Sequence, residues 1–232
     1  MQPPIFWNQM SWHSQACEVY MMMNNKTDAF NRKDHWEHVY SDKEATEVSW
    51  FQQCPENSLG LIKATGVEKS ARIIDIGGGA STLVDFLLAA GYQDLSVLDI
   101  AQSAIEQAKD RLGQDAAKIK WIVQDITKFT TEEAFDVWHD RAVFHFLTDG
   151  EDRLSYVKAM TDALKPGAHA IIATFNLDGP EKCSGLEIVQ YSPESLSAIF
   201  SEDFQLIETS TEQHETPSGG SQSFVYCRFK RV

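Results

Sequence analysis

Two patterns of apolar residues alternate along the chain from residue 71 onward. Short runs rich in Ile, Val and Leu, bounded by Gly or polar residues, predict buried strands. The stretches between them carry apolar residues at helical spacing and end in Gly, which predicts helices. The predicted strands are 71–76, 95–100, 118–126, 134–140 and 168–176, and the predicted helices are 81–91, 101–113 and 151–167. Near-continuous apolar strands joined by helices predict a parallel sheet that is covered on both faces.

The pattern changes in the last third of the chain. Residues 192–200 begin with Ser-Pro-Glu and predict a helix, 203–213 predict a strand, and 218–232 form a Gly-bounded alternating run. The last two segments suit an antiparallel pair at one edge, which gives an α/β sheet of seven strands. Before the sheet, 34–52 and 55–66 predict helical segments that cap it.

Length and composition favour one globular domain. The chain has 232 residues, of which 43% are apolar and 23% charged. We expect a single domain over 35–232, preceded by an N-terminal extension over 1–34 that is either disordered or a lid. That extension has no basic start followed by an apolar core, so we do not expect a secretory signal, and no apolar run reaches the roughly 18–20 residues of a membrane-spanning helix.

Net charge and the spacing of the cysteines limit the kinds of partner that we expect. The net charge is −14, and Lys and Arg are scattered except near 228–231, so bulk nucleic-acid binding is not expected. The four cysteines are far apart and form no CxxC pair, which favours reduced thiols in the cytoplasm and no metal site. The same features favour a monomer that is not bound to a membrane, although the sequence leaves the oligomeric state open.

A glycine-rich turn follows the first strand, in the stretch RIIDIGGGAST over 72–82. Gly77 and Gly79 allow the main chain to approach a ligand closely, at the carboxyl end of a strand where open α/β sheets bind ligands. The Gly-Lys-Ser/Thr ending of a phosphate-binding P-loop is absent. A dinucleotide fingerprint would need a third glycine where Thr82 stands, which weakens that interpretation.

Acidic residues at three strand ends discriminate between ligands. Asp99 ends the second strand, where a carboxylate can accept hydrogen bonds from both ribose hydroxyls. Asp75 lies just before the glycines, where it suits an ammonium group better than a pyrophosphate. Asp125 ends the third strand and suits an exocyclic amine such as adenine N6. Ribose, adenine and a cationic amino-acid tail together describe S-adenosylmethionine.

Four pieces in this order, DIGGGAS, LDIA, QDIT and WHDRAVFHFL, resemble the class I S-adenosylmethionine-dependent methyltransferases over roughly 35–232. The resemblance implies a Rossmann-like fold, S-adenosyl-L-methionine as cofactor and S-adenosyl-L-homocysteine as product. A third glycine common in the first motif of the family is replaced here by Ser81. The implied cofactor contacts are Asp75, Gly77, Gly78, Gly79, Ser81, Asp99, Ile100, Asp125, Ile126 and Asp140, with Trp36, Tyr40 and Trp50 covering the site.

The acceptor end of the site is expected beyond the fourth strand. The stretch WHDRAVFHFLTDGEDR resembles the thiopurine-type branch of these methyltransferases, which implies an arginine near a small substrate. His139, inside the strand, suits a hydrogen-bonded core residue better than a base, whereas His145 lies past the strand end. The candidate catalytic residues are Asp140, Arg141 and His145, and the candidate substrate contacts are Phe51, Phe144, His145, Arg153 and Cys183.

The expected activity is methyl transfer to a small molecule, on a thiol or a selenium- or tellurium-type acceptor. If both Cys183 and His214 face the pocket, such a soft acceptor is favoured. A protein methyltransferase acting on lysine or another side chain shares the cofactor half, and the −14 charge would suit a basic peptide. A non-catalytic S-adenosylmethionine-binding protein and an NAD(P)-dependent oxidoreductase remain alternatives, and the sequence leaves the acceptor open.

Overall fold

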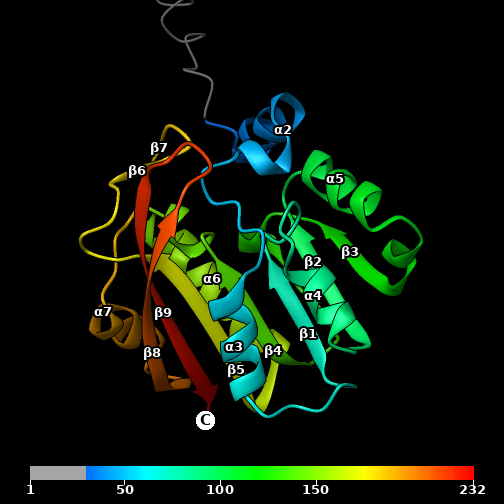
Figure 1. Cartoon of the computed structure of the whole chain (residues 1–232). Helices are drawn as coiled ribbons and strands as arrows, with labels where there is room; N and C mark the ends of the chain where they lie inside the picture. Colours follow the sequence, from blue (N-terminus) through cyan, green and yellow to red (C-terminus); the bar gives the residue numbers. More distant parts are fainter. Residues whose placement is uncertain (1–29) are drawn as a thin grey trace, which may run out of the picture. The chain divides into compact units, whose positions relative to one another are not determined.

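Seven strands form one sheet in the order β3-β2-β1-β4-β5-β9-β8 in the computed structural model, which describes residues 30–232 (Figure 1). Residues 33–232 form one compact unit. The strands of the sheet are β1 (Arg72–Ile76), β2 (Asp94–Asp99), β3 (Ile119–Val123), β4 (Phe135–Arg141), β5 (Leu164–Phe175), β8 (Phe204–Glu215) and β9 (Ser221–Arg231). The first five are parallel, whereas β9 runs antiparallel to both β5 and β8. The predicted Rossmann-like sheet with an antiparallel C-terminal edge is therefore confirmed.

Helices connect the strands and cover both faces of the sheet. The helices are α2 (Arg32–Asp42), α3 (Glu56–Ala64), α4 (Leu83–Ala89), α5 (Gln102–Leu112), α6 (Gly150–Ala163) and α7 (Pro193–Phe200). Short 3₁₀ turns lie at η1 (Ala45–Glu47), η2 (Gly113–Lys118), η3 (Ile126–Lys128) and η4 (Phe144–Phe146). Apolar residues of α3 and α4 pack on one face, and those of α6 and α7 pack on the other. Alternate residues of the central strands enter these two cores, because side chains of a strand point to opposite faces.

Several predicted boundaries differ from the structure. The third strand ends at Val123 because Asp125 caps η3, where its side chain accepts the N–H of Thr127. The helix predicted over 151–167 ends at Ala163, and β5 starts at once. The segment predicted to be helical over 34–52 contains α2 and η1, followed by irregular backbone. A short hairpin of β6 (Lys182–Cys183) and β7 (Leu186–Glu187) was not predicted, because two-residue strands leave no periodic pattern.

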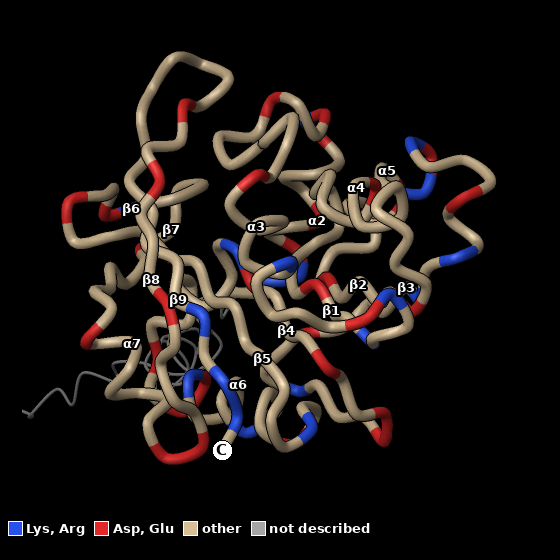
Figure 2. The backbone as a smooth tube through the Cα atoms, turned by 60° about the horizontal axis from the view of Figure 1, so that its bottom comes forward, with Lys and Arg blue, Asp and Glu red and all other residues tan. Residues whose placement is uncertain are grey.

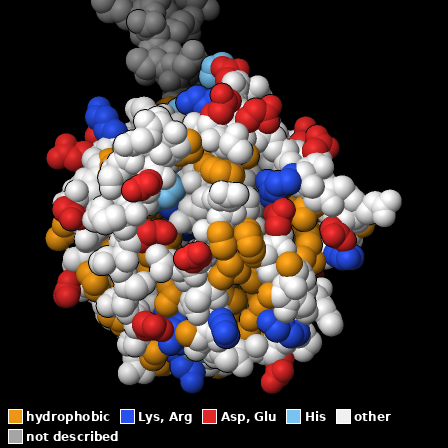
Figure 3. Space-filling view, in the orientation of Figure 1, with side chains coloured by type: hydrophobic (Ala, Val, Ile, Leu, Met, Phe, Trp, Pro, Cys, Tyr) orange, Lys and Arg blue, Asp and Glu red, His pale blue; other side chains and the backbone are white. Residues whose placement is uncertain are grey.

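The boundary expected at residue 34 and the N-terminal extension remain predictions, since residues 1–29 lie outside the described residues. In the part that is described, no helix is both long and apolar enough to cross a membrane. Basic residues near the C-terminus follow β9 beside acidic residues of β8 (Figure 2), and Arg228 pairs there with Glu208 at 2.8 Å. On the face shown in Figure 3, basic side chains lie singly among acidic ones, so this face carries no basic stripe.

Candidate active site

A cleft lies at the carboxyl ends of β1 and β4, with an empty volume of about 520 Å³ including its mouth. This is the edge where parallel α/β sheets bind their ligands. Its walls come from the glycine turn, from the ends of the two strands, and from the segment between α2 and α3. Among the expected site residues, the cleft is lined by Tyr40, Trp50, Phe51, Asp75, Gly77, Gly78, Ser81 and Arg141.

The glycine turn is packed so closely that side chains would not fit. Gly77 has a φ of +67°, and a Cβ there would overlap Val143. A Cβ on Gly78 would overlap the Asp75 carboxylate, and one on Gly79 would lie 2.7 Å from Asp99 Oδ2. Only glycine therefore allows the main chain of the turn to lie this close to the two carboxylates.

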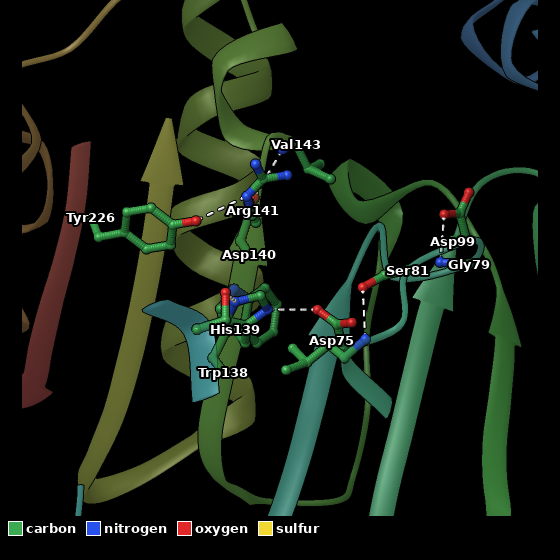
Figure 4. A network of polar contacts seen from close by, with 12 residues as sticks. Asp75, Gly79, Ser81, Asp99, Trp138, His139, Asp140, Arg141, Val143 and Tyr226 are labelled. Carbon is green, nitrogen blue, oxygen red and sulfur yellow. Dashed lines mark hydrogen bonds and ion pairs between the residues drawn. The ribbon is translucent and has the colours of Figure 1, made fainter. Parts of the chain in front are cut away.

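Asp99 is held by the backbone of the turn and of the helix that follows. Its Oδ2 accepts the N–H of Gly79 at 3.0 Å (Figure 4), and its Oδ1 accepts the N–H of Ala101 at 2.9 Å. Burial raises the pKa of Asp99 to about 6, although these N–H groups favour the ionised form. The structure places Ile100, Asp125 and Ile126 at or just beyond the ends of the neighbouring strands β2 and β3.

The end of β4 sends alternate side chains to the two faces of the sheet. Val137 packs in the core beneath α3 and α4, whereas Trp138 packs in the core beneath α6. By the same alternation, His139 and Arg141 reach the cleft, and Asp140 points to α6. Figure 4 shows His139 pointing toward Asp75 and Arg141 toward Tyr226.

Asp140 is fully buried, and its oxygens are occupied by groups of the protein. The Tyr156 hydroxyl donates to Oδ2 at 2.6 Å, and the backbone N–H groups of Val143 and Phe144 donate to the carboxylate. Burial raises the pKa of Asp140 to about 6. The Asp140 carboxylate thus orders the turn after β4 through its hydrogen bonds. It does not line the cleft, so neither of its oxygens faces a ligand there.

Arg141 is fixed at the other end of the cleft. Its Nε donates to the Tyr226 hydroxyl at 2.9 Å, and one terminal nitrogen donates to the backbone oxygen of Trp50 at 2.9 Å. Glu212 lies 3.8 Å from the second terminal nitrogen, Nη2, which is buried without a hydrogen-bond partner. Arg141 thus keeps one buried donor, Nη2, without a hydrogen bond.

Four candidate substrate residues are not brought to the cleft lining. Phe144 is fully buried against Tyr156, and Arg153 donates to the backbone oxygens of 147 and 148 near the start of α6. His145 is fully buried, its Nδ1 accepts the N–H of Phe175, and burial lowers its pKa to about 3. Cys183 is buried, and burial raises its pKa to about 11, so it stays a neutral thiol.

His214 does not line the cleft either. Its Nε2 lies 2.8 Å from the backbone oxygen of Ser49, and burial lowers its pKa. The condition that Cys183 and His214 both face the pocket is therefore not met in the structure.

Tyr40 of α2 and Trp50 of the following segment line the cleft, and Trp36 packs against both without belonging to the lining. The rings of Trp36, Tyr40 and Trp50 contact one another at centroid distances of 5.7–6.2 Å. Glu37 connects α2 to the first turn of α5, where its carboxylate accepts the N–H groups of Gln102 and Ser103 at 2.8 and 3.0 Å. Burial opposes ionisation, but these N–H groups lower the pKa of Glu37 overall.

Some cleft residues were absent from the prediction. Ser58 of α3 and Gln52 line the cleft, and Tyr226 and Glu212 order Arg141 from the C-terminal strands. His139 was interpreted as a core residue, and it is both buried and part of the lining. Within residues 30–232, no group of three or more His, Cys, Asp or Glu could hold a metal ion.

The known proteins to which this chain is similar include methyltransferases. A family model described as "Methyltransferase domain" matches residues 73–167. The eEF1A lysine and N-terminal methyltransferase of Mus musculus is 27% identical over 133 residues, which are 56% of this chain and 19% of that protein. Nodulation protein S of Rhizobium tropici is 29% identical over 104 residues, 45% of this chain and 43% of that protein. The chain therefore spans less than half the length of these relatives.

The fold is also shared with solved structures. The N-methyltransferase NodS from Bradyrhizobium japonicum WM9, in complex with S-adenosyl-l-homocysteine, superposes with a TM-score of 0.64 at 20% identity. The match covers 84% of this chain and 97% of that one. At this identity the similarity describes the fold alone and says nothing of which residues bind a ligand.

Proposed function

The chain carries a class I S-adenosylmethionine-dependent methyltransferase domain, and from that premise we propose that it methylates a small molecule that arrives already deprotonated. The observation that carries the proposal is the partly covered cleft, which joins the glycine turn to Arg141 beside the rings of Tyr40 and Trp50. A covered cleft suits methyl transfer, which requires alignment and exclusion of water.

The residues of the turn fit the cofactor. Asp75 Oδ2 is a buried acceptor without a partner, in a carboxylate that lines the cleft beside Gly78, which suits an ammonium group. Asp99 would accept the ribose hydroxyls, with Asp125 and the side chains of Ile100 and Ile126 around the adenine. S-adenosylmethionine supplies an electrophilic methyl group on a sulfonium when it is bound. Tyr40 and Trp50 would then cover it and exclude water.

The titratable residues of the cleft limit which methyl acceptors can react there, because some acceptors must first lose a proton. They are Tyr40, Asp75, His139 and Arg141. Burial raises the pKa of Tyr40 far above neutral pH, and both ring nitrogens of His139 are occupied. With Asp75 assigned to the ammonium group of the cofactor, no residue of the described lining is left to remove a proton from the acceptor. This favours a nucleophile that carries its lone pair at neutral pH, such as a thiolate, a selenium or tellurium anion, or an uncharged nitrogen.

Arg141 would orient such an acceptor. Its Nη2 is a buried donor that is not used within the protein, and Phe51 lines the same cleft. A guanidinium favours an anionic acceptor over a cationic one. The confined space beneath Trp50 and Phe51 favours a small molecule.

A protein acceptor is the second candidate. The net charge of −14 would attract a basic peptide, and one relative named above is an eEF1A lysine methyltransferase. A lysine side chain would have to enter as a free amine, past Arg141, which repels the ammonium form. This repulsion is the reason to rank the small-molecule acceptor first.

Calorimetry followed by a product assay tests the proposal. We expect S-adenosylhomocysteine to bind at micromolar concentration and NADH not to bind. Methyl release is then measured with thiols, selenite, tellurite, heteroaromatic amines and a protein extract. Binding of NADH alone would point to an oxidoreductase, and binding without any turnover would point to a sensor. Methylation confined to the protein extract would favour the second candidate.

A further inference from the structure

Three buried side chains from three different elements form a hydrogen-bonded chain beneath the cleft. Ser58 Oγ of α3 lies 2.8 Å from His139 Nε2, and His139 Nδ1 lies 2.6 Å from Asp75 Oδ1. Their exposed fractions are 0%, 3% and 4%. The contact between β1 and β4 is visible in Figure 4. Burial of three polar side chains is costly unless each of them is paired, so the arrangement needs an explanation.

The hydrogen-bond partners fix the donor in the contact with Asp75. The carboxylate of Asp75 accepts, so Nδ1 of His139 carries a proton. Nε2 pairs with the Ser58 hydroxyl, which can act as donor or as acceptor. Ser58 is fully buried and its hydroxyl is paired with His139, so the chain serves to hold Asp75 in place.

One oxygen of the chain is left without a hydrogen-bond partner, and it belongs to a carboxylate that lines the cleft. Asp75 Oδ2 is buried without a partner, and it lies where a Cβ on Gly78 would be. Of the described Lys and Arg side chains, none is paired with Asp75. Asp75 also raises the pKa of the buried carboxyls of Asp99 and Asp140. A cation at Oδ2 would satisfy the oxygen and offset this repulsion.

We propose that Ser58 and His139 are positioning residues that fix the Asp75 carboxylate, so that its free oxygen selects a cofactor with an ammonium group. This rests on the proposed function, because the ammonium belongs to the amino-acid portion of S-adenosylmethionine. The terminal torsion of an aspartate is broad and roughly two-fold, so an unanchored carboxylate would turn its oxygens freely. The hydrogen bond from Nδ1 assigns Oδ1 to the protein and leaves Oδ2 to the ligand.

The test compares two ligands that differ only in the ammonium group. The dissociation constants of S-adenosylhomocysteine and of its deamino analogue are measured by calorimetry for the intact chain and its variants. His139→Phe keeps a ring but removes the donor, whereas His139→Asn keeps a donor near the position of Nδ1. Ser58→Ala removes the outer member of the chain. Ser96→Ala is the matched control, because Ser96 is equally buried and its hydroxyl has no partner.

We expect His139→Phe to weaken S-adenosylhomocysteine by about 10- to 100-fold and the deamino analogue by about 2-fold or less. His139→Asn should restore most of the preference, and Ser58→Ala should reduce it by about 3- to 10-fold. Ser96→Ala should change neither constant.

An equal loss for both ligands in His139→Phe and Ser58→Ala would show a merely structural role and overturn the inference. If His139→Phe does not fold, Ser58→Ala decides alone. Failure of the unmodified chain to bind S-adenosylhomocysteine would instead refute the proposed function itself, so the two failures are distinguishable.

Discussion

Removing the Tyr156 hydroxyl should destabilise the domain strongly, although Tyr156 lies outside the cleft. The hydroxyl donates to Asp140 Oδ2 at 2.6 Å and accepts the indole N–H of Trp138 at 2.9 Å. All three side chains are fully buried, so water cannot replace the lost group. Tyr156→Phe therefore leaves a carboxylate and an indole N–H with one partner fewer, while the packing of the ring is retained.

The magnitude follows from the two bonds. A hydrogen bond to a buried charged group contributes about 1.5–3 kcal/mol and a neutral one about 0.5–1.5 kcal/mol, so a loss of roughly 2–4 kcal/mol is expected. For a domain of this size that lowers Tm by roughly 5–15 °C. Tyr191→Phe is the matched control, because the Tyr191 hydroxyl is buried without a partner and its removal should leave Tm nearly unchanged.

Thermal unfolding of both variants checks the reasoning, and pH adds a second measurement. Burial raises the pKa of Asp140 to about 6, and the bond from Tyr156 partly offsets the rise, so the variant carboxyl titrates higher still. The Tm difference from the unmodified chain should therefore be full above the pKa of the variant carboxyl and should narrow as pH falls from there to about 6, below which the carboxyl is protonated in both chains. Equal Tm values for Tyr156→Phe and Tyr191→Phe would refute the structural role of Asp140.

Two further predictions concern the cofactor end. Burial raises the pKa of Asp99 to about 6, and the ionised carboxylate is the acceptor for the ribose hydroxyls. The affinity for S-adenosylhomocysteine, measured by calorimetry, should therefore fall about tenfold per pH unit below 6. Asp99→Asn should lack this pH dependence. Glu37→Gln removes one of two acceptors for the N–H groups of Gln102 and Ser103, so hydrogen exchange at these amides should accelerate about tenfold; unchanged exchange would contradict the contact.

The gathering of acidic residues at one edge of the sheet could be predicted from sequence because it depends on the order of strands and on where each strand ends. Asp75, Asp99 and Asp125 each stand at or near the end of a predicted strand, and parallel strands bring their carboxyl ends to one edge. The glycines follow from the same logic, since only they fit between Val143 and the two carboxylates. The positions of these residues in the fold therefore follow from the order of the strands along the chain.

The end of β4 shows how far a family resemblance can be carried over residue by residue. The resemblance placed both Asp140 and Arg141 at the ligand, but adjacent residues of a strand point to opposite faces. With Trp138 and Asp140 facing α6, the cleft receives His139 and Arg141. The alternation was present in the sequence, and applying it would have exchanged Asp140 for His139.

The acceptor end could not be predicted because its geometry comes from residues far away in the chain. Arg141 is oriented by Tyr226 and Glu212, 85 and 71 positions further along, and the antiparallel register of β8 and β9 brings these two together. The cofactor contacts that we infer come from residues at the ends of β1, β2 and β3, not from β8 and β9. Substitutions at Tyr226 or Glu212 can thus re-aim the guanidinium, and with it the choice of acceptor, without disturbing Asp75 or Asp99. Domains that share this cofactor half can therefore act on unlike acceptors.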